Sequence, residues 1–161
     1  DAYRNVNGLT ILRFFNVFGP GELHKDTMVS IPTRFILDAL KQGKIEIWSQ
    51  TGAPIQSRDF ISVYDVCDAV MHLLRETIKQ TEILDVGMSI SRTFKEVAQI
   101  ISKIVPCSIK VVDFPEFINV NEYQQYTRSS TNLEHRFLDF RYSDFESRLI
   151  ELAHYIKAKV K

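Results

Sequence analysis

The chain has 161 residues, which is enough for one domain with a hydrophobic core. Apolar residues make up 45% and charged residues 25%, both ordinary for a globular domain. Its 20 basic and 20 acidic side chains cancel, so no net field favours nucleic acid or a membrane as a partner, and any anion site must be local. We find no apolar run of bilayer-spanning length and no signal peptide, and therefore expect a cytoplasmic protein.

The first elements are read from hydrophobic patterning. Leu9–Phe15 is almost continuously apolar, which is typical of a strand buried on both faces. Residues 16–29 are predicted to form a polar loop. Ile31–Gln42 has the apolar spacing of a helix, and Gly43 is a plausible stop. A short strand at Ile45–Trp48 is expected next, followed by a loop.

Three later helices have the same start signal, a hydroxyl residue with an acid three positions on. The pairs are Ser62 with Asp65, Thr93 with Glu96, and Ser143 with Glu146. Each pair precedes an apolar stripe at helical spacing, and such stripes are typical of core faces rather than of cofactor sites.

The fold class follows from the order of the elements. Strands are also expected at Glu82–Val86 and Ser108–Val112, and an ordered loop at residues 115–130. Strands and helices therefore alternate, which predicts a single α/β domain over residues 1–161 with at least part of its sheet parallel.

Two strand junctions carry polar side chains suited to an anionic ligand. Arg58 stands at the start of an apolar run, where a guanidinium can bind two phosphate oxygens. A structural ion pair with Asp59, Asp65 or another acid is the alternative. Asn16, at the end of the first strand, could donate its amide to the same ligand, or could bond its own turn backbone.

Other polar residues give weaker signals. Lys25, in a polar stretch near Asn16, could pair with phosphate or carry a proton, or could be a solvated surface side chain. Tyr123 offers a phenol within the long loop. The four histidines are dispersed, so no metal site is expected. Cys67 and Cys107 are expected to be reduced, buried thiols.

Several motifs are missing from the 161 residues. There is no Gly-x-Gly-x-x-Gly or Gly-x-x-Gly-x-x-Gly pattern that would cradle a dinucleotide pyrophosphate. There is also no Gly-x-Ser-x-Gly elbow and no Walker-type loop. The one Tyr-x-x-x-Lys spacing, at Tyr155 and Lys159, falls within the last amphipathic helix and is interpreted as a coincidence.

Two segments resemble a known family. Residues 13–20 resemble the Arg-x-x-Asn-x-Tyr-Gly-Pro signature of extended short-chain dehydrogenase/reductases that act on nucleotide sugars, and residues 58–66 resemble that family's Arg-Asp-Phe-x-x-Val-x-Asp-Val segment. The resemblance covers roughly residues 9–105. Residues 21–30 look like the Gly-His-Lys-Gly-Ser-Met-Ala-Ser stretch of the ADP-glyceromanno-heptose 6-epimerase branch. Residues 123–127 are similar to its Tyr-Gln-x-Phe-Thr segment.

The resemblance implies roles for individual residues. Lys25 would be a catalytic acid/base near the cofactor, and the backbone at Phe15 and Val17 would lie near the nicotinamide. The remaining implied residues would bind substrate: Asn16, Thr27, Arg34, Trp48, Ser49, Gln50, Thr51, Arg58 and Tyr123. Arg34 replaces a His of the heptose branch, and one residue is inserted before Arg58, so the exact sugar stays open.

The family places its Gly-rich loop and its Tyr-x-x-x-Lys pair before the strand that begins here at Leu9. The resemblance therefore implies the C-terminal, substrate-binding lobe of such an enzyme without its N-terminal Rossmann core. Leu9–Phe15 and Glu82–Val86 would join the sheet of that missing half. The implied cofactor is NAD or NADP, with NADP if the heptose likeness holds. The implied partners are a nucleotide-diphosphate sugar, the N-terminal half and a second copy in a homo-oligomer.

Three functions remain open from the sequence. The chain could be half of a nucleotide-sugar epimerase or dehydratase that makes, for example, a lipopolysaccharide precursor. It could instead be a sugar-nucleotide binding module without catalysis, or a scaffold that keeps the fold without a ligand.

Overall fold

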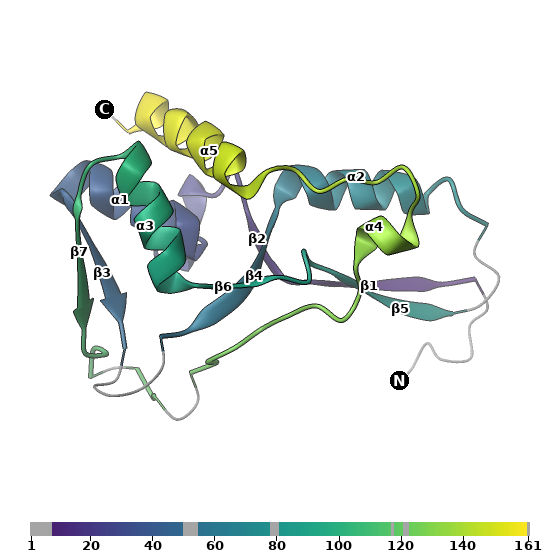
Figure 1. The fold of residues 1–161 in the computed structure, drawn as a ribbon, viewed down its shortest axis with the longest axis horizontal. Coiled ribbons are helices and arrows are strands. Elements are labelled where there is room, and N and C mark those ends of the chain that lie inside the picture. Colours follow the sequence, from purple (N-terminus) through teal and green to yellow (C-terminus); the bar gives the residue numbers. More distant parts are fainter. Residues whose placement is uncertain (1–7, 50–54, 78–80, 117, 121–122, 161) are drawn as a thin grey trace.

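The computed structural model describes residues 8–49, 55–77, 81–116, 118–120 and 123–160. Within these ranges the strands form three small sheets that follow one another along the long axis of the molecule (Figure 1). One end carries β1 (Thr10–Phe14) and β5 (Glu82–Val86). The other end carries β3 (Lys44–Trp48) and β7 (Ser108–Val112).

The middle sheet joins β2 (Asn16–Phe18), β4 (Ser57–Ser62) and β6 (Ser91–Thr93). Strands β2 and β4 are parallel, with Asn16 opposite Phe60, whereas β6 runs antiparallel to β4. The two terminal pairs, β1 with β5 and β3 with β7, are also parallel. The expected α/β class with a partly parallel sheet is therefore confirmed.

Helices cover these sheets. The α1 helix (Ile31–Gln42) begins at Ser30, whose hydroxyl accepts a hydrogen bond from the Thr33 amide, and ends at Gly43, whose φ of 64° suits a residue without a Cβ. The α3 (Phe94–Ile104) and α5 (Phe145–Lys159) helices lie beside α1. The α2 helix (Val63–Leu73) and the short α4 (Leu133–Arg136) lie towards the β1/β5 end (Figure 1).

Aromatic rings connect the middle sheet to two of these helices. The centroids of Phe18 and Phe145 lie 5.4 Å apart, and the Phe60 ring lies 6.2 Å from Phe94 and 6.4 Å from Phe145. All four side chains are buried. Such aromatic contacts stabilise a core beyond the area that they bury, so they fix the strands that carry Asn16 and Arg58.

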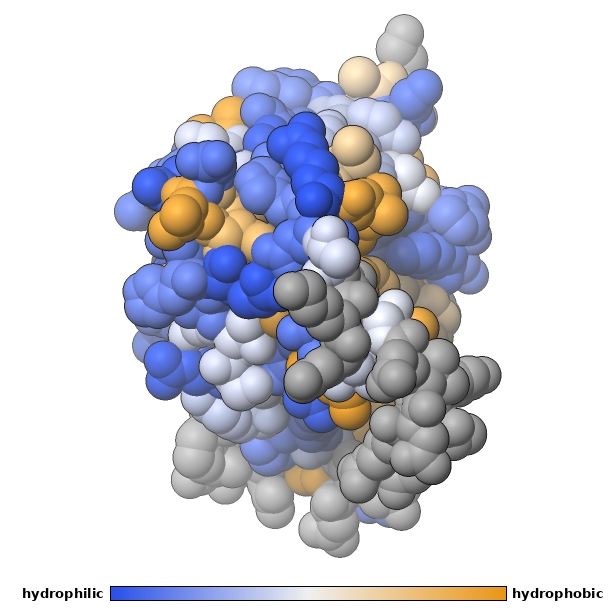
Figure 2. Space-filling view, turned by 90° about the vertical axis from the view of Figure 1, so that its right-hand side faces the viewer, coloured by the Kyte–Doolittle hydropathy of each residue, from blue (hydrophilic) through white to orange (hydrophobic). Residues whose placement is uncertain are grey.

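The first strand differs from its expected form. The strand expected at residues 9–15 is β1 (Thr10–Phe14), whereas Asn16–Phe18, expected as loop, forms the separate strand β2 and pairs with β4. Burial on both faces was also wrong, because Arg13 and Phe14 are exposed and Ile83 of β5 is 52% exposed. Figure 2 looks onto this end of the molecule and shows apolar patches set among hydrophilic side chains.

Two of the three helix starts also differ. Thr93 and Glu96 form the predicted reciprocal capping box. Ser62 caps α2, but the Asp65 carboxylate turns away and accepts hydrogen bonds from the amide and hydroxyl of Ser143. Because Ser143 is used in this way, α5 is capped instead by Asp144, which accepts from the Ser147 amide.

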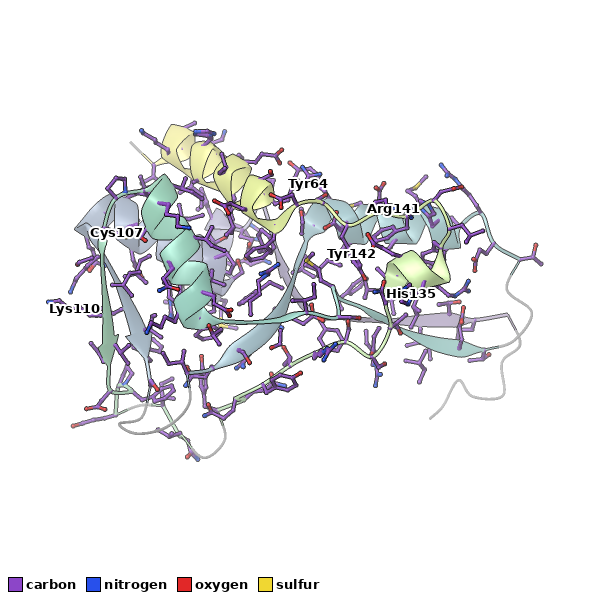
Figure 3. All side chains as sticks on the ribbon, viewed as in Figure 1. Tyr64, Cys107, Lys110, His135, Arg141 and Tyr142 are labelled. Carbon is purple, nitrogen blue, oxygen red and sulfur yellow. The ribbon has the colours of Figure 1, made fainter. Side chains whose placement is uncertain are left out.

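The remaining segments fill the space between these elements. Residues 23–28 form a 3-10 helix, η1 (Leu23–Met28), within the predicted loop. Neither β6 nor α4 was expected from the sequence. Tyr142, labelled in Figure 3, donates to the Gly87 carbonyl and accepts from the Leu133 amide, and burial raises the pKa of its phenol to about 12. No helix in the described ranges is long and apolar enough to cross a membrane.

The Asp144 cap gives a stability prediction. Asp144→Ala should lower the free energy of unfolding by about 1 kcal/mol at neutral pH, measured by urea denaturation, because the Ser147 amide loses its acceptor. Hydrogen bonds from Ser147 hold the pKa of Asp144 below its ordinary 3.8. Its contribution is therefore complete above that value and is lost as the pH falls through the lower folded pKa.

Glu146→Ala is the matched control, because Glu146 lies in the same first turn without capping it. We expect it to cost only a few tenths of a kcal/mol, roughly the helix-dipole contribution. Equal losses in the two variants would contradict the assignment of Asp144 as the cap.

Candidate functional site

A cavity of about 320 Å³ opens beside the middle sheet, and we call it the Arg58 cavity. Asn16 enters it from β2, Arg58 from β4, Lys25 from η1 and Tyr123 from the long loop. Phe60 and Phe94 supply apolar wall. Four candidates from separate parts of the sequence therefore meet in one place.

Arg58 is held by its own segment and by the long loop. Its guanidinium donates to the Ser57 carbonyl at 2.9 Å and to the Gln124 carbonyl. It lies 5.4 Å from the Phe94 ring centroid and 5.8 Å from that of Tyr123, at cation–π distances. Burial lowers the pKa of Arg58 from its ordinary value, but an arginine stays charged at neutral pH.

The alternative for Arg58, an ion pair with Asp59 or Asp65, is wrong. The Asp65 carboxylate is bonded to Ser143, and Asp59 is bonded to backbone amides. The charge of Arg58 is thus met by carbonyl oxygens and aromatic faces, which leave its other N–H donors able to bind an anion in the cavity.

Asn16 is already engaged within the protein. Its Nδ2 donates to the Asp59 carbonyl at 3.0 Å and to Thr127 Oγ1 at 2.9 Å. Its side-chain amide joins β2 to β4 and to the long loop rather than bonding its own turn. A contact between Asn16 and an anion would need its backbone N–H or the release of one of these bonds, so its role in binding stays a prediction.

Lys25 lies on the rim of the Arg58 cavity and is exposed, as are Asp26, Thr27 and Met28. Thr27 is not among the residues that line the cavity. Asp26 has φ 49° and ψ −114°, a conformation that glycine adopts at much lower cost. In the heptose-branch pattern a glycine stands at this position.

The long loop is attached to the sheet by a buried carboxylate. Asp59 is completely buried, and its oxygens accept hydrogen bonds from the amides of Met88, Ser89 and Ser129 at 2.8 to 3.0 Å. Its backbone amide donates to Thr127 Oγ1 at 3.0 Å. Residue 59 therefore fixes both the turn after β5 and the segment that follows Tyr123.

Gly87 makes this arrangement possible. A Cβ at position 87 would lie 2.7 Å from Asp59 Oδ2 and 2.8 Å from Ser129 Oγ. These distances are shorter than real Cβ contacts, so only glycine allows the turn to approach the carboxylate this closely. The sequence alone indicated neither the need for glycine at position 87 nor the role of Asp59, although Asp59 belongs to the family pattern at residues 58–66.

Three further candidates lie apart from the Arg58 cavity. The Arg34 guanidinium stacks on the Trp48 ring at 4.4 Å, and burial lowers the pKa of Arg34 while Asp38 opposes that shift. Ser49 is buried at the end of β3, where its amide donates to the Val112 carbonyl. Gln50 and Thr51 lie outside the described residues, so the expected nucleotide wall at 48–51 stays a prediction.

A second cavity, of about 490 Å³, lies on the other side of Asn16 and includes Phe15. It opens at the carboxyl ends of β1 and β5, the position at which parallel sheets bind dinucleotides. Arg13 and Asp85 line it and form an ion pair at 2.6 Å. Burial raises the pKa of Asp85, but hydrogen bonds from Ser130 and Arg13 outweigh that effect and lower it overall.

The described part of the chain holds neither a metal-binding cluster nor a disulfide. No group of three or more His, Cys, Asp or Glu side chains there could hold a metal ion. Both cysteines are free, but the expectation of burial was wrong, because Cys67 is exposed on α2 and Cys107 is only partly buried. Burial nevertheless raises the pKa of the Cys107 thiol.

The Asp59 network gives a second prediction. Asp59→Asn places an NH2 group against at least one of three backbone N–H donors, which leaves a buried donor without an acceptor. We expect a loss of about 2–4 kcal/mol in unfolding free energy, measured by urea denaturation. The exposed Asp139 is the control, and Asp139→Asn should change stability by less than about 0.5 kcal/mol. A loss as small as the control's would contradict the network.

The family model and a curated relative both assign this chain's similarity to epimerases. The model of the NAD dependent epimerase/dehydratase family matches residues 1–87. An ADP-L-glycero-D-manno-heptose-6-epimerase from Cupriavidus pinatubonensis is 33% identical over 93 residues, which are 56% of this chain and 28% of that protein.

Solved structures agree on the fold. The ADP-L-glycero-D-manno-heptose-6-epimerase of Helicobacter pylori matches 98% of this chain and 47% of its own length, with a TM-score of 0.78 at 22% identity. The Thermus thermophilus UDP-glucose 4-epimerase, in complex with NAD, matches 95% and 48%, with a TM-score of 0.74 at 19% identity. The chain thus spans less than half the length of these relatives. Since the family model matches more than half of its residues, the chain belongs to the NAD dependent epimerase/dehydratase family.

Proposed function

We propose that this chain is the substrate-binding half of an NAD(P)-dependent nucleotide-sugar epimerase that resembles ADP-heptose 6-epimerases. The observation that carries the proposal is the Arg58 cavity, where Asn16, Lys25, Arg58 and Tyr123 meet. These residues come from four separate segments, and each one matches the position of a substrate-binding or catalytic residue in the family resemblance.

The charges in the cavity support an anionic ligand. Arg58 and Lys25 bring two cations to it, whereas Glu22 is the one carboxylate among the lining residues that the structure describes. The carboxylate oxygens of Glu22 face backbone amides and hydroxyls. The chain as a whole is neutral, so the excess is local, and a diphosphate bound by the Arg58 guanidinium would use it.

The family chemistry gives Lys25 its role. A bound nicotinamide supplies a hydride acceptor that can return the hydride to either face of the sugar carbon. The sugar oxygen must lose a proton on one face and regain it on the other. The tyrosine of the family's Tyr-x-x-x-Lys pair cannot readily serve both faces. Lys25, on the rim of the Arg58 cavity, would carry the proton on one face, while Tyr123 and Arg58 hold the substrate.

The relatives support a heptose-like sugar and a nicotinamide cofactor. The curated relative is named as an ADP-heptose epimerase and one structural relative holds NAD. We propose an ADP-heptose-like substrate, a lipopolysaccharide precursor, and NADP rather than NAD as the heptose branch implies. Arg34, which replaces a His of that branch, is a difference from it. The Arg34 guanidinium stacks on Trp48, in the expected nucleotide wall, and does not line the Arg58 cavity.

The N-terminal half would complete the sheet at β1. Phe14 and Ile83 are 53% and 52% exposed, although parallel strands are ordinarily covered on both faces. We propose that residues 9–15 and 82–86 join a dinucleotide-binding sheet. The backbone at Phe15 and Val17 would then lie near the nicotinamide. We also propose that the complete enzyme is a cytoplasmic homo-oligomer.

Lys25→Ala tests the catalytic role. In the complete enzyme we expect turnover to fall by about 10²–10⁴-fold, because proton transfer loses its carrier. The KM for the nucleotide sugar should change by less than about threefold, since Arg58 and Tyr123 remain. Initial rates of epimerisation, followed over a range of substrate concentrations, measure both quantities.

Lys103→Ala is the control, because Lys103 is an exposed lysine on α3 outside both cavities. It should leave turnover unchanged. Unchanged turnover in Lys25→Ala itself would remove Lys25 from the catalytic residues and favour a binding module that lacks catalysis.

Arg58→Ala tests the role of Arg58 in diphosphate binding. We expect the affinity for a nucleotide diphosphate such as ADP to fall by about 10- to 100-fold, the effect of losing hydrogen bonds to a charged group. Isothermal titration of the complete protein measures it, and Arg141→Ala, an exposed arginine, is the control. If neither the unaltered protein nor its Arg58 variant binds nucleotide diphosphates, the ligand-free scaffold becomes the better reading.

A further inference from the structure

Glu22 is a buried carboxylate that the proposed reaction does not use. It is 7% exposed and stands just before η1, at the base of the loop that carries Lys25. It accepts four hydrogen bonds: from the Gly19 amide at 3.1 Å, the Ser30 amide at 2.7 Å, the Ser30 hydroxyl at 2.8 Å and the Thr33 hydroxyl at 2.9 Å. Such a carboxylate costs free energy to bury unless donors surround it, as they do here.

These bonds connect the two ends of the loop. Gly19 lies at the entry, after β2, and Ser30 lies at the exit, as the cap of α1. Glu22 also begins the first turn of η1, because its backbone carbonyl accepts a hydrogen bond from the Lys25 amide at 2.8 Å. Glu22 thus fixes where the loop leaves the sheet, where it joins the helix and where Lys25 stands.

The tip of the loop has little other support. Residues 24–28 are all exposed, and no residue of η1 is buried. Asp26 has a backbone conformation that is costly for a residue with a Cβ, which favours opening of the tip. The loop keeps its shape because its base is closed, and the four bonds to Glu22 close it.

We propose that Glu22 is the positioning residue for Lys25: its carboxylate closes the base of the 19–30 loop and so places the Lys25 ammonium at the rim of the Arg58 cavity. The inference rests on the proposed function for the part played by Lys25, but the closing of the loop can be tested without it. An ammonium displaced by about 1 Å from its reacting atom can lose a factor of the order of 10² in rate.

The first test measures the loop itself. Trypsin cleaves after lysine, and its access to the bond between Lys25 and Asp26 depends on opening of the loop. Glu22→Ala in the full chain should raise the cleavage rate at Lys25 by at least about tenfold, measured by mass spectrometry against cleavage at Arg141. Arg141 is an exposed residue towards the β1/β5 end of the molecule (Figure 3), so its cleavage is a reference for opening away from the loop.

Graded variants separate the effect of closing the loop base from the effect of losing the negative charge of Glu22. Glu22→Gln should fall between the unaltered protein and Glu22→Ala, because its carboxamide oxygen can still accept from some of the donors. Thr33→Val removes one donor and should have a smaller effect. Glu116→Gln, at an exposed position, should have none. An unchanged cleavage rate at Lys25 in Glu22→Ala, or an equal rise at Arg141, would overturn the proposal.

The second test is a double-mutant cycle in the complete enzyme. Glu22→Ala should lower turnover by about 10- to 100-fold with little change in KM, as expected when a reacting group is misplaced. Combined with Lys25→Ala it should lower turnover no further, within about twofold, because Glu22 acts through Lys25. Losses that multiply would show that Glu22 acts elsewhere and would overturn its positioning role.

The two proposals fail in different ways. If Lys25→Ala leaves turnover unchanged, the proposed catalytic role falls, and the cleavage rate at Lys25 alone decides whether Glu22 holds the loop. If Lys25→Ala is inactive but Glu22→Ala is fully active, the catalytic role stands and the positioning role is wrong.

Discussion

The buried carboxylate of Asp59 is the constraint on which the rest of the structure depends. It has no cation partner among the described residues, and three backbone amides stabilise it instead. Amides are fixed dipoles within the chain, so the carboxylate determines where the turn after β5 and the segment after Tyr123 must lie. Arg58, its neighbour in β4, points towards the Arg58 cavity because successive side chains of a strand face opposite ways.

The same reasoning applies at Glu22, which lines the Arg58 cavity. Each carboxylate is buried, each binds backbone amides, and each closes a loop onto the middle sheet, which carries both Arg58 and Asn16. Both carboxylates are satisfied by these donors, and Arg58 donates to carbonyl oxygens, so neither Arg58 nor Lys25 forms an ion pair within the described residues. This separation keeps positive charge available to a ligand while the protein as a whole stays neutral.

The sequence predicts those parts of the fold that depend on neighbouring residues. The bounds of α1, β5 and β7 agree with their expected ranges, because apolar spacing and the Gly43 stop are local signals. The cap at Ser143 was misread because Asp65, 78 residues away, takes its hydroxyl. Likewise Arg58 and Asn16 could be found from motifs, whereas the partners of Asp59 lie 29 to 70 residues away and could not.

Asn16 connects the Arg58 cavity to the β1/β5 end of the molecule. Asn16 borders both cavities, so a ligand in the Arg58 cavity and a group at the carboxyl ends of β1 and β5 would meet across one residue. Its side chain is held by Asp59 and Thr127. Displacement of the 123–130 segment would therefore move Asn16 together with Tyr123. The hydrogen bonds that fix this side of the Arg58 cavity thus also fix the side of the second cavity that Asn16 lines.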